Sequence, residues 1–299
     1  MKNIINEHIN IFLEKLDKKY PGHTIIWNYF KKQENGKLLR PSLFLKTFEH
    51  TGKKIENIYY DIAAGIEMLH IFALIHDDIV DKSDYRRNNL SFHKMLEKKF
   101  GENSTGAAII AGDILYTGAL EYIYEKFILI NKIEVFGFIM ECSMKTALGQ
   151  WRELTEDYKI NEKEIFSLYD SKTSIYTFLC PVITALKISE QPEKISEYTK
   201  DCMIAGKIYQ LKNDIADISE NQNNEPFFED FKTRRKNYVY YEITKNKTKK
   251  EKEEIDYIYQ QKEIEKFKKI ILNENIIFKI QNRIKTLETH IQQRNFFTF

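Results

Sequence analysis

The chain has 299 residues, of which 42% are hydrophobic, and its 46 Lys and Arg nearly balance its 44 Asp and Glu. So many apolar residues can bury a large core, and the near-neutral balance gives no reason to expect nucleic acid as a partner. Only 5 Pro and 11 Gly predict a helical chain with few breaks. No repeat or linker divides it, so we expect one all-α domain over residues 1–299.

The three cysteines, Cys142, Cys180 and Cys202, are odd in number and widely spaced in apolar surroundings. They are predicted to be reduced core residues, without disulfide or metal spacing. The first residues lack the unbroken apolar stretch of a secretory signal, and no window has the roughly 18 uncharged apolar residues of a spanning helix. We therefore expect a cytoplasmic protein with no transmembrane segment.

The first predicted elements are a helix over residues 4–19 and a polar motif after it. Apolar residues recur at helical spacing in 4–19, and Pro21-Gly22 ends the helix. The motif runs from Gly36 to Pro41 and contains Lys37 and Arg40, three residues apart. Gly lets a backbone approach a ligand, Pro favours a helix start, and the two cations form a candidate phosphate-binding face.

A long apolar helix is then predicted to end in the acids Asp77, Asp78 and Asp81. Residues four apart stack on one helix face, so Asp77 and Asp81 point the same way, with Asp78 beside them. The apolar residues before them predict burial, and buried carboxylates need cations. Mg²⁺ held by one or two carboxylates also takes substrate phosphates. The simpler alternative is a solvated, charged helix end.

A second predicted helix ends in a similar polar cluster. Gln210 and Asn213 are followed by Asp214 and Asp217, again after an apolar helical stretch. Two such helix ends could face each other across one cavity and clamp several Mg²⁺ ions around a diphosphate.

The remaining predicted helices are expected to have structural roles. Two helices are expected over residues 107–150, and the Lys- and Glu-rich part from about residue 243 is typical of a solvated helix face. A narrow apolar seam alternates spacings of three and four at Ile277, Ile280, Ile284, Leu287 and Ile291. Such a seam packs on a neighbouring helix or on a partner subunit, and core packing is favoured.

Taken together, the motifs resemble those of the trans-isoprenyl diphosphate synthases, the polyprenyl synthetase family, over about residues 36–240. The first acid cluster with Arg86-Arg87 matches the family's first aspartate-rich motif, and the second cluster approximates its second. The resemblance implies an isoprenoid synthase helical bundle around a deep central cavity. It also implies isopentenyl diphosphate and an allylic diphosphate (dimethylallyl, geranyl or farnesyl) as substrates, about three Mg²⁺ ions with Mn²⁺ as an alternative, and a homodimer.

The resemblance further implies roles for individual residues. The isopentenyl diphosphate ligands would be Gly36, Lys37, Arg40, His70 and Arg87. The allylic diphosphate ligands would be Arg86, Lys172 and Lys236. The metal ligands would be Asp77, Asp81, Asn213, Asp214 and Asp217. Catalysis would involve Asp77, Asp78, Asp81, Lys172, Thr173, Gln210 and Asp214, with Thr173 helping to stabilise a carbocation. Gly149-Gln150 matches a family helix that carries a polar residue toward the active site. Phe100-Gly101 and Ala111-Gly112-Asp113 match segments whose small residues allow close helix packing.

The chain departs from the family pattern at a few positions. Asn213 stands where the family has Asp, and a neutral amide is a weaker Mg²⁺ ligand. Glu225-Pro226 replaces a Gly-Lys pair, so the candidate substitutes for that lysine are Lys232, Arg234 and Arg235.

These observations predict a prenyltransferase that condenses isopentenyl diphosphate head-to-tail with an allylic diphosphate. Phe72, the fifth residue before Asp77, is bulky and Ala73 is small. By resemblance this pair predicts a C20 product, geranylgeranyl diphosphate, with farnesyl diphosphate as the next candidate.

Other classes of protein stay open. A class I terpene cyclase would need Ser or Thr and then Glu where Asp217 and Asn221 stand. A non-catalytic subunit of a heteromeric synthase, or a helical scaffold, would explain Asn213. An HD-type phosphohydrolase at His76-Asp77 would need further His and Asp ligands that the sequence does not place.

Overall fold

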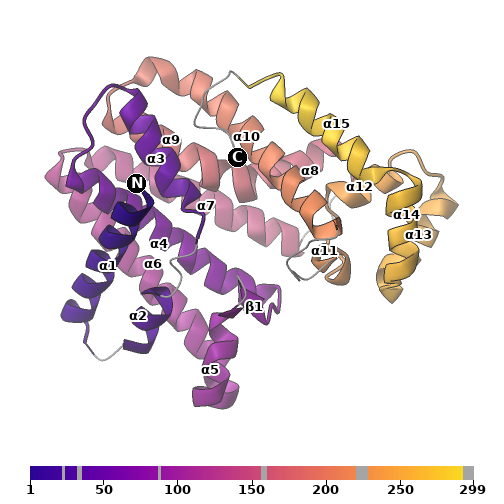
Figure 1. Cartoon of the computed structure of the whole chain (residues 1–299), viewed down its shortest axis with the longest axis horizontal. Helices are drawn as coiled ribbons and strands as arrows, with labels where there is room; N and C mark the ends of the chain where they lie inside the picture. The colour runs from indigo at the N-terminus through magenta and orange to yellow at the C-terminus, as the bar shows by residue number, and fades with distance from the viewer. Residues whose placement is uncertain (22–23, 32–35, 87–88, 156–159, 220–227, 292–299) are drawn as a thin grey trace. The chain divides into compact units, whose positions relative to one another are not determined.

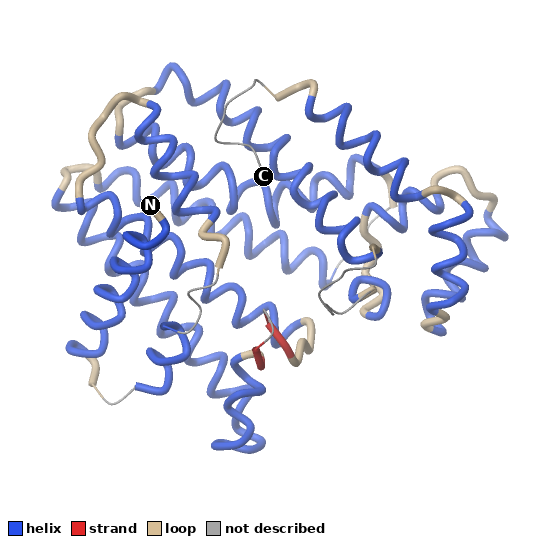
Figure 2. Tube along the Cα trace, in the orientation of Figure 1, coloured by secondary structure: helices blue, strands red, loops and turns tan. Residues whose placement is uncertain are grey.

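The computed structural model describes residues 1–21, 24–31, 36–86, 89–155, 160–219 and 228–291, and nearly all of them are helical (Figures 1 and 2). The predicted all-α class is confirmed. Within these ranges the strands are β1 (Tyr85–Arg86) and β2 (Asn89–Leu90), an antiparallel pair in which Tyr85 lies opposite Leu90. The chain forms two compact units. Unit 1 is Met1–Met140 with Cys180–Ile195, and unit 2 is Glu141–Leu179 with Ser196–Phe299. The expectation of one domain stays a prediction.

Most helices belong to a single unit. Unit 1 contains α1 (Lys2–Lys19), α2 (Thr24–Lys31), α3 (Leu39–His50), α4 (Asn57–Val80), α5 (Phe92–Phe100), the 3₁₀ turn η1 (Gly101–Asn103), α6 (Ser104–Leu129) and α9 (Cys180–Ile188). Unit 2 contains α8 (Glu162–Tyr169), the π-helix η2 (Asp170–Leu179), α11 (Glu229–Lys232), α12 (Tyr238–Thr244), α13 (Lys249–Gln261), α14 (Ile264–Asn273) and α15 (Ile276–Glu288). Two helices have residues in both units, α7 (Ile133–Thr155) and α10 (Pro192–Ile218).

Helix α4 lies at the centre of the unit 1 core, where it packs against α1, α3 and α6 (Figure 1). Its apolar residues are spread around the whole helix, and Ile62, Ala63 and Met68 are completely buried. A helix that is apolar on every side is stable in water when its neighbours cover it. By length and composition α4 could cross a membrane, but 56% of its apolar window is buried inside the protein, as in the core helix of a soluble protein.

Small residues bring α4 and α6 together. A Cβ added to Gly65 of α4 would lie 2.4 Å from Cγ1 of Ile123, and one added to Gly112 of α6 would lie 2.5 Å from Nε2 of His76. The predicted close packing at Ala111-Gly112-Asp113 is confirmed. The same prediction for Phe100-Gly101 was wrong, because a Cβ on Gly101 would meet no atom within 4 Å and the residue instead ends α5 with a φ of +52°.

Unit 2 has a core of its own, rich in aromatic rings. Phe231 stacks on Phe267 with ring centroids 4.2 Å apart, and Tyr259 packs edge-on against both. The C-terminal apolar seam belongs to this core: Ile280, Ile284 and Leu287 are buried, and Ile277 and Ile291 pack against the cluster. The preference for core packing over a subunit contact is confirmed. The three cysteines are free and buried, also as predicted.

The π-helix η2 is held between two glycines of unit 2. A Cβ on Gly149 of α7 would lie 2.7 Å from the side chain of Ser171, and one on Gly206 of α10 would lie 2.2 Å from Oγ of Ser174. The backbone of η2 therefore lies directly against both helices. π-Helical turns are rare and are frequent at functional sites, and this one carries Lys172 and Thr173.

Candidate active site

The first acid cluster is the C-terminal end of α4. Asp77 and Asp78 lie in the last turn, and Asp81 is the residue that caps the helix. Asp78 is 2% exposed and accepts hydrogen bonds from Nε of Arg86, at 2.8 Å, and from its Nη2. Asp77 and Asp81 are half-buried. The cluster therefore combines one inward, neutralised carboxylate with two that reach solvent.

In the first acid cluster, burial and the neighbouring charges shift the pKa values of Asp78 and Arg86 in opposite directions. Burial raises the pKa of Asp78, and the guanidinium of Arg86 offsets only part of that rise. Burial alone would lower the pKa of Arg86, but Asp78 outweighs it and the charges of Asp77 and Asp81 add to the effect. Arg86 thus stays charged within the field of all three acids.

The candidate ligands of isopentenyl diphosphate lie on or next to α3 and α4, two helices that pack together. Gly36 and Lys37 precede α3, and Lys37 is exposed. Helix α3 begins at Leu39, so Arg40 belongs to its first turn and Lys37 precedes the helix; their predicted phosphate-binding role stays a prediction. His70 is half-buried on α4. Arg87 lies outside the described residues.

The candidate product-length residues lie on α4, just before the first acid cluster. The ring of Phe72 is 4.8 Å from the ring of His76 and 4.6 Å from the ring of Tyr116 on α6. Phe72 and Ala73 are both half-buried. The sequence did not predict Tyr116, which lies more than forty residues further along the chain and reaches Phe72 only because α4 and α6 pack together.

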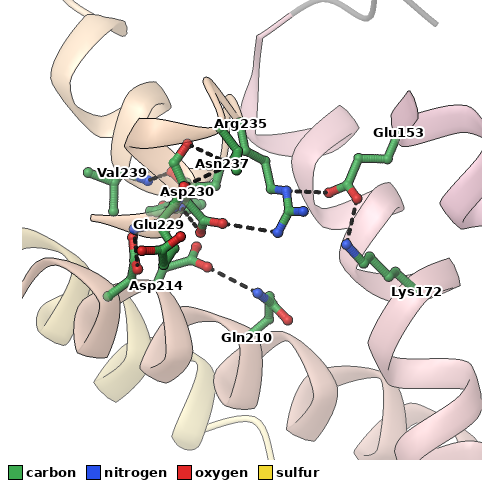
Figure 3. A network of polar contacts seen from close by, with 12 residues as sticks. Glu153, Lys172, Gln210, Asp214, Glu229, Asp230, Arg235, Asn237 and Val239 are labelled. Carbon is green, nitrogen blue, oxygen red and sulfur yellow. Dashed lines mark hydrogen bonds and ion pairs between the residues drawn. The ribbon is translucent and has the colours of Figure 1, made fainter. Parts of the chain in front are cut away.

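The second acid cluster lies near the end of α10, where Figure 3 shows Asp214 and Gln210. Asp214 is completely buried, and its two oxygens accept hydrogen bonds from the Tyr169 hydroxyl and from Nε2 of Gln210, the latter at 3.1 Å. Asn213, next to it, is exposed. Asp217 is half-buried and accepts the backbone N–H groups of residues 229 and 230 at 2.9 and 3.2 Å.

These carboxylates repel one another. Burial first, and then the charge of Asp230, raise the pKa of Asp214 to about 8 against the hydrogen bonds from Tyr169 and Gln210. Burial and Asp230 also raise the pKa of Asp217 to about 6. The second cluster therefore holds more negative charge than the described part of unit 2 compensates locally.

Glu153 of α7 organises the cations of this cluster (Figure 3). It forms ion pairs with Nζ of Lys172 and, at 3.8 Å, with Nε of Arg235. Arg235 also pairs with Asp230 at 3.0 Å. Burial works to raise the pKa of Glu153, but the charges of Lys172 and Arg235 outweigh it and hold that pKa below its usual value.

The three candidate substitutes for the missing lysine have different partners in the structure. Lys232 pairs with Glu229, and Arg234 donates to the carbonyl of Gln260, both at exposed positions. Arg235 alone among the three joins the network of Asp230 and Glu153. Lys236, which the resemblance assigns to the allylic diphosphate, pairs with Asp256 at 3.3 Å and lies over the ring of Tyr240.

Sequence reasoning missed Glu153, Asp230 and Tyr169. Glu153 lies one helical turn after Gly149, so the spacing from the Gly149-Gln150 motif could have identified it. Asp230 and Tyr169 reach Asp214 from distant parts of the chain, and no local pattern marks them. The amide nitrogen of Gln150 is buried with no hydrogen-bond partner among the described residues, so it is available as a donor.

The candidate metal ligands of the two acid clusters suit a hard divalent cation such as Mg²⁺. Within the described residues no three His, Cys, Asp or Glu side chains form a metal site by themselves. The acids are carboxylates, which suit Mg²⁺. Burial first, and then the charge of Asp230, raise the pKa of Asp214 and Asp217, and a bound cation would favour their ionised forms.

The chain is similar in sequence to a known protein family and to several of its characterised members. The family model described as polyprenyl synthetase matches residues 24–273. The chain is 29% identical over 190 residues to a geranylgeranyl diphosphate synthase of Methanosarcina mazei, with 62% of this chain and 55% of the relative covered. It is 29% identical over 232 residues to a short chain isoprenyl diphosphate synthase of Methanocaldococcus jannaschii, with 74% and 65% covered. The matches thus span under two thirds of the length of these relatives.

A solved structure shares the fold. Geranylgeranyl pyrophosphate synthase from Corynebacterium glutamicum, complexed with isoprenyl diphosphate and magnesium, superposes with a TM-score of 0.81 at 19% identity. The match covers 96% of this chain and 89% of that one.

Proposed function

The chain belongs to the polyprenyl synthetase family, and from that premise we propose that it is a trans-prenyltransferase that joins isopentenyl diphosphate to an allylic diphosphate. The main support is the unit 2 network in which Lys172 and Arg235 pair with Glu153, and Arg235 also pairs with Asp230, whose charge acts on Asp214 of α10. Cations beside carboxylates that can hold a divalent metal are what a diphosphate leaving group requires. Arg40 at the start of α3, with Lys37 before that helix and His70 on α4, would form a second anion site, which a terpene cyclase does not need.

Metal binding is proposed for the acids of both motifs. About three Mg²⁺ ions, with Mn²⁺ as an alternative, would be held by carboxylate and amide oxygens. Those ligands are Asp77, Asp81, Asn213, Asp214 and Asp217. When bound, the ions neutralise charge that develops on the departing diphosphate.

The side chains of the protein carry the other parts of the reaction. Lys172, Arg86 and Arg235 donate to the allylic diphosphate, whose C–O bond breaks and leaves its electron pair on the diphosphate. The hydroxyl of Thr173 stabilises the allylic cation. Lys37 and Arg40, with His70 and Arg87, hold isopentenyl diphosphate so that its double bond supplies the electron pair of the new C–C bond. Loss of a proton to the departing diphosphate completes the product, which is five carbons longer than the primer.

Product length is proposed to be C20, geranylgeranyl diphosphate. The support is the bulk of Phe72 against Tyr116, one and a half turns before Asp77, because an aromatic pair there limits how far a growing chain extends along α4. Phe72→Ala is expected to lengthen the product while leaving its rate of formation within about threefold. An unchanged distribution of product lengths by mass spectrometry would remove Phe72 from this role.

The enzyme is further proposed to be a cytoplasmic homodimer. The support is an exposed apolar stripe on α7, where Met144, Leu148 and Trp151 are 62%, 58% and 65% exposed at helical spacing. A stripe of this kind is more stable when a second copy covers it. Light scattering should give twice the mass of one chain, and Trp151→Glu should halve it; a monomeric wild-type protein would contradict the proposal.

Release of diphosphate tests the reaction class. With Mg²⁺, wild-type protein should release diphosphate only when isopentenyl diphosphate and an allylic diphosphate are both present. Release from the allylic substrate alone would indicate a cyclase or a hydrolase. No release with any primer would indicate a non-catalytic subunit, for which the exposed Asn213 and the fully hydrogen-bonded Asp214 would be the structural reason.

A further inference from the structure

Tyr169, the last residue of α8, has no part in the proposed reaction, and it lies at one end of a buried chain of hydrogen bonds. Its hydroxyl accepts the backbone N–H of Tyr238 at 2.9 Å and donates to Oδ2 of Asp214. Tyr169 and Asp214 are both buried, so water does not compete for these bonds. The N–H of Tyr238 occupies the acceptor side of the hydroxyl, so its single proton is directed at Asp214.

The chain continues from Asp214 through Gln210 to Thr173 of η2. Nε2 of Gln210 donates to Oδ1 of Asp214 at 3.1 Å (Figure 3), and Oγ1 of Thr173 donates to Oε1 of Gln210 at 3.1 Å. Gln210 thus presents its NH₂ group to Asp214 and its amide oxygen to Thr173. The proton of Thr173 is thereby used within the protein.

The direction of these bonds decides what Thr173 offers to a substrate. A hydroxyl whose proton is bonded to Gln210 presents oxygen lone pairs on its other side. Lone pairs stabilise a neighbouring positive charge, whereas a hydroxyl proton turned outward would repel it. The orientation of this one hydroxyl therefore matters for a reaction that passes through an allylic cation.

We propose that Tyr169 is a positioning residue: by holding Asp214 it orients Gln210, and through Gln210 it turns the oxygen lone pairs of Thr173 toward the allylic cation. The inference rests on the proposed prenyltransferase function. It assigns no contact between Tyr169 and the substrate.

The backbone of η2 is fixed independently of this chain. Ser174, next to Thr173, packs on Gly206 and donates to Oδ1 of Asp170 at 3.0 Å. A threonine side chain in a helix still divides between two rotamers, so a fixed backbone does not fix its hydroxyl. Loss of the Tyr169 hydroxyl should thus disorder the orientation of Thr173 without moving η2.

Tyr169→Phe removes the hydroxyl and keeps the ring. We expect kcat for condensation to fall about tenfold to a hundredfold, with KM for isopentenyl diphosphate unchanged, as when a group that orients a ligand is lost. Tyr238→Phe is the matched control. It removes another hydroxyl bonded to an acid, Glu162 at 2.8 Å, but keeps the backbone N–H that Tyr169 accepts, and it should leave kcat near wild type.

A double-mutant cycle gives the decisive comparison. If Tyr169 acts through Thr173, Tyr169→Phe should cost little further kcat in a Thr173→Val background. Full additivity, or an unchanged kcat for Tyr169→Phe, would overturn the proposal while wild-type condensation still supports the function. If Tyr169→Phe fails to fold, Gln210→Met breaks the same chain one link later and should show the same non-additivity. An inactive wild-type protein would instead refute the proposed function itself.

Discussion

At the end of α4 the buried carboxylate of Asp78 is neutralised by Arg86, eight residues along the chain, whereas the buried carboxylate of Asp214 on α10 is held by the neutral donors Tyr169 and Gln210. Asp77 and Asp81 remain half-buried around the first site. Around the second, the acids Asp217 and Asp230 add to the negative charge and raise the pKa of Asp214.

The difference shows two ways to keep an acid cluster in a helical core. In the first cluster, an ion pair with Arg86 offsets part of the cost of burying the inward member, Asp78. The second is electrostatically strained, and its cations Lys172 and Arg235 are shared with Glu153. The neutral Asn213 reduces that strain, since an Asp there would add a further charge to a crowded group.

The largest expected effect is the loss of Asp81, a proposed metal ligand of the first cluster that is half-buried. Asp81→Asn should lower kcat/KM about 10³-fold, because removal of a group that stabilises leaving-group charge costs several kcal/mol. Steady-state kinetics at saturating Mg²⁺ would measure it. Asp84→Asn is the matched control, since Asp84 is exposed and pairs with Lys94; an equal loss in both variants would contradict the assignment.

Glu153→Gln should have the next largest effect. It leaves Lys172 and Arg235 without their shared carboxylate, so kcat/KM for the allylic substrate should fall about tenfold to a hundredfold. Glu164→Gln, which breaks the Arg152 pair at a half-exposed position, should change it less than threefold. Equal kinetics for Glu153→Gln and wild type would show that the network does not position the two cations.

Asn213→Asp restores the missing charge of the second cluster. The Mg²⁺ concentration for half-maximal activity should fall about threefold to tenfold, because each ligand charge strengthens a hard-cation site. The metal-free protein should be less stable, since the new charge lies beside Asp214 and Asp217. An unchanged Mg²⁺ dependence would mean that residue 213 takes no part in metal binding.

The smallest expected effect is a pH dependence of stability that arises from the second cluster. The pKa of Asp214 is about 8 in the folded protein against 3.8 for an ordinary Asp, so between these values the folded state binds more protons than the unfolded state. Metal-free protein should therefore lose stability as pH rises from about 4 to about 8. Calorimetry of Asp214→Asn should show a flatter slope over that range; an identical slope would assign the effect to other groups.

The sequence predicted the parts of the site that depend on local periodicity. Asp77, Asp78 and Asp81 lie at one helix end because the apolar run before them forms α4, and the spacing alone indicates this. The sequence could not distinguish Arg235 from Lys232 and Arg234. Which of them reaches the network depends on the turn after α11, where Arg234 adopts a φ of +60°. Tyr169 reaches Asp214 across forty-five residues, and such a contact follows from tertiary packing alone.

The sequence also did not predict the π-helical form of η2. Lys172 and Thr173 were expected from their order between the acid motifs, but the pattern gave no sign of a widened helix. Gly149 and Gly206 let η2 pack closely against α7 and α10, at Ser171 and Ser174. The role of Lys236 at the allylic diphosphate stays a prediction, and Arg235, which pairs with Asp230 and Glu153, is a further candidate.

The most direct test of the proposed function is the product formed from isopentenyl diphosphate and Mg²⁺ with dimethylallyl, geranyl or farnesyl diphosphate, each assayed separately and resolved by mass spectrometry. We expect every accepted primer to be elongated in five-carbon steps to geranylgeranyl diphosphate and no further. A protein that consumes no isopentenyl diphosphate with any of the three primers would contradict the assignment as a prenyltransferase.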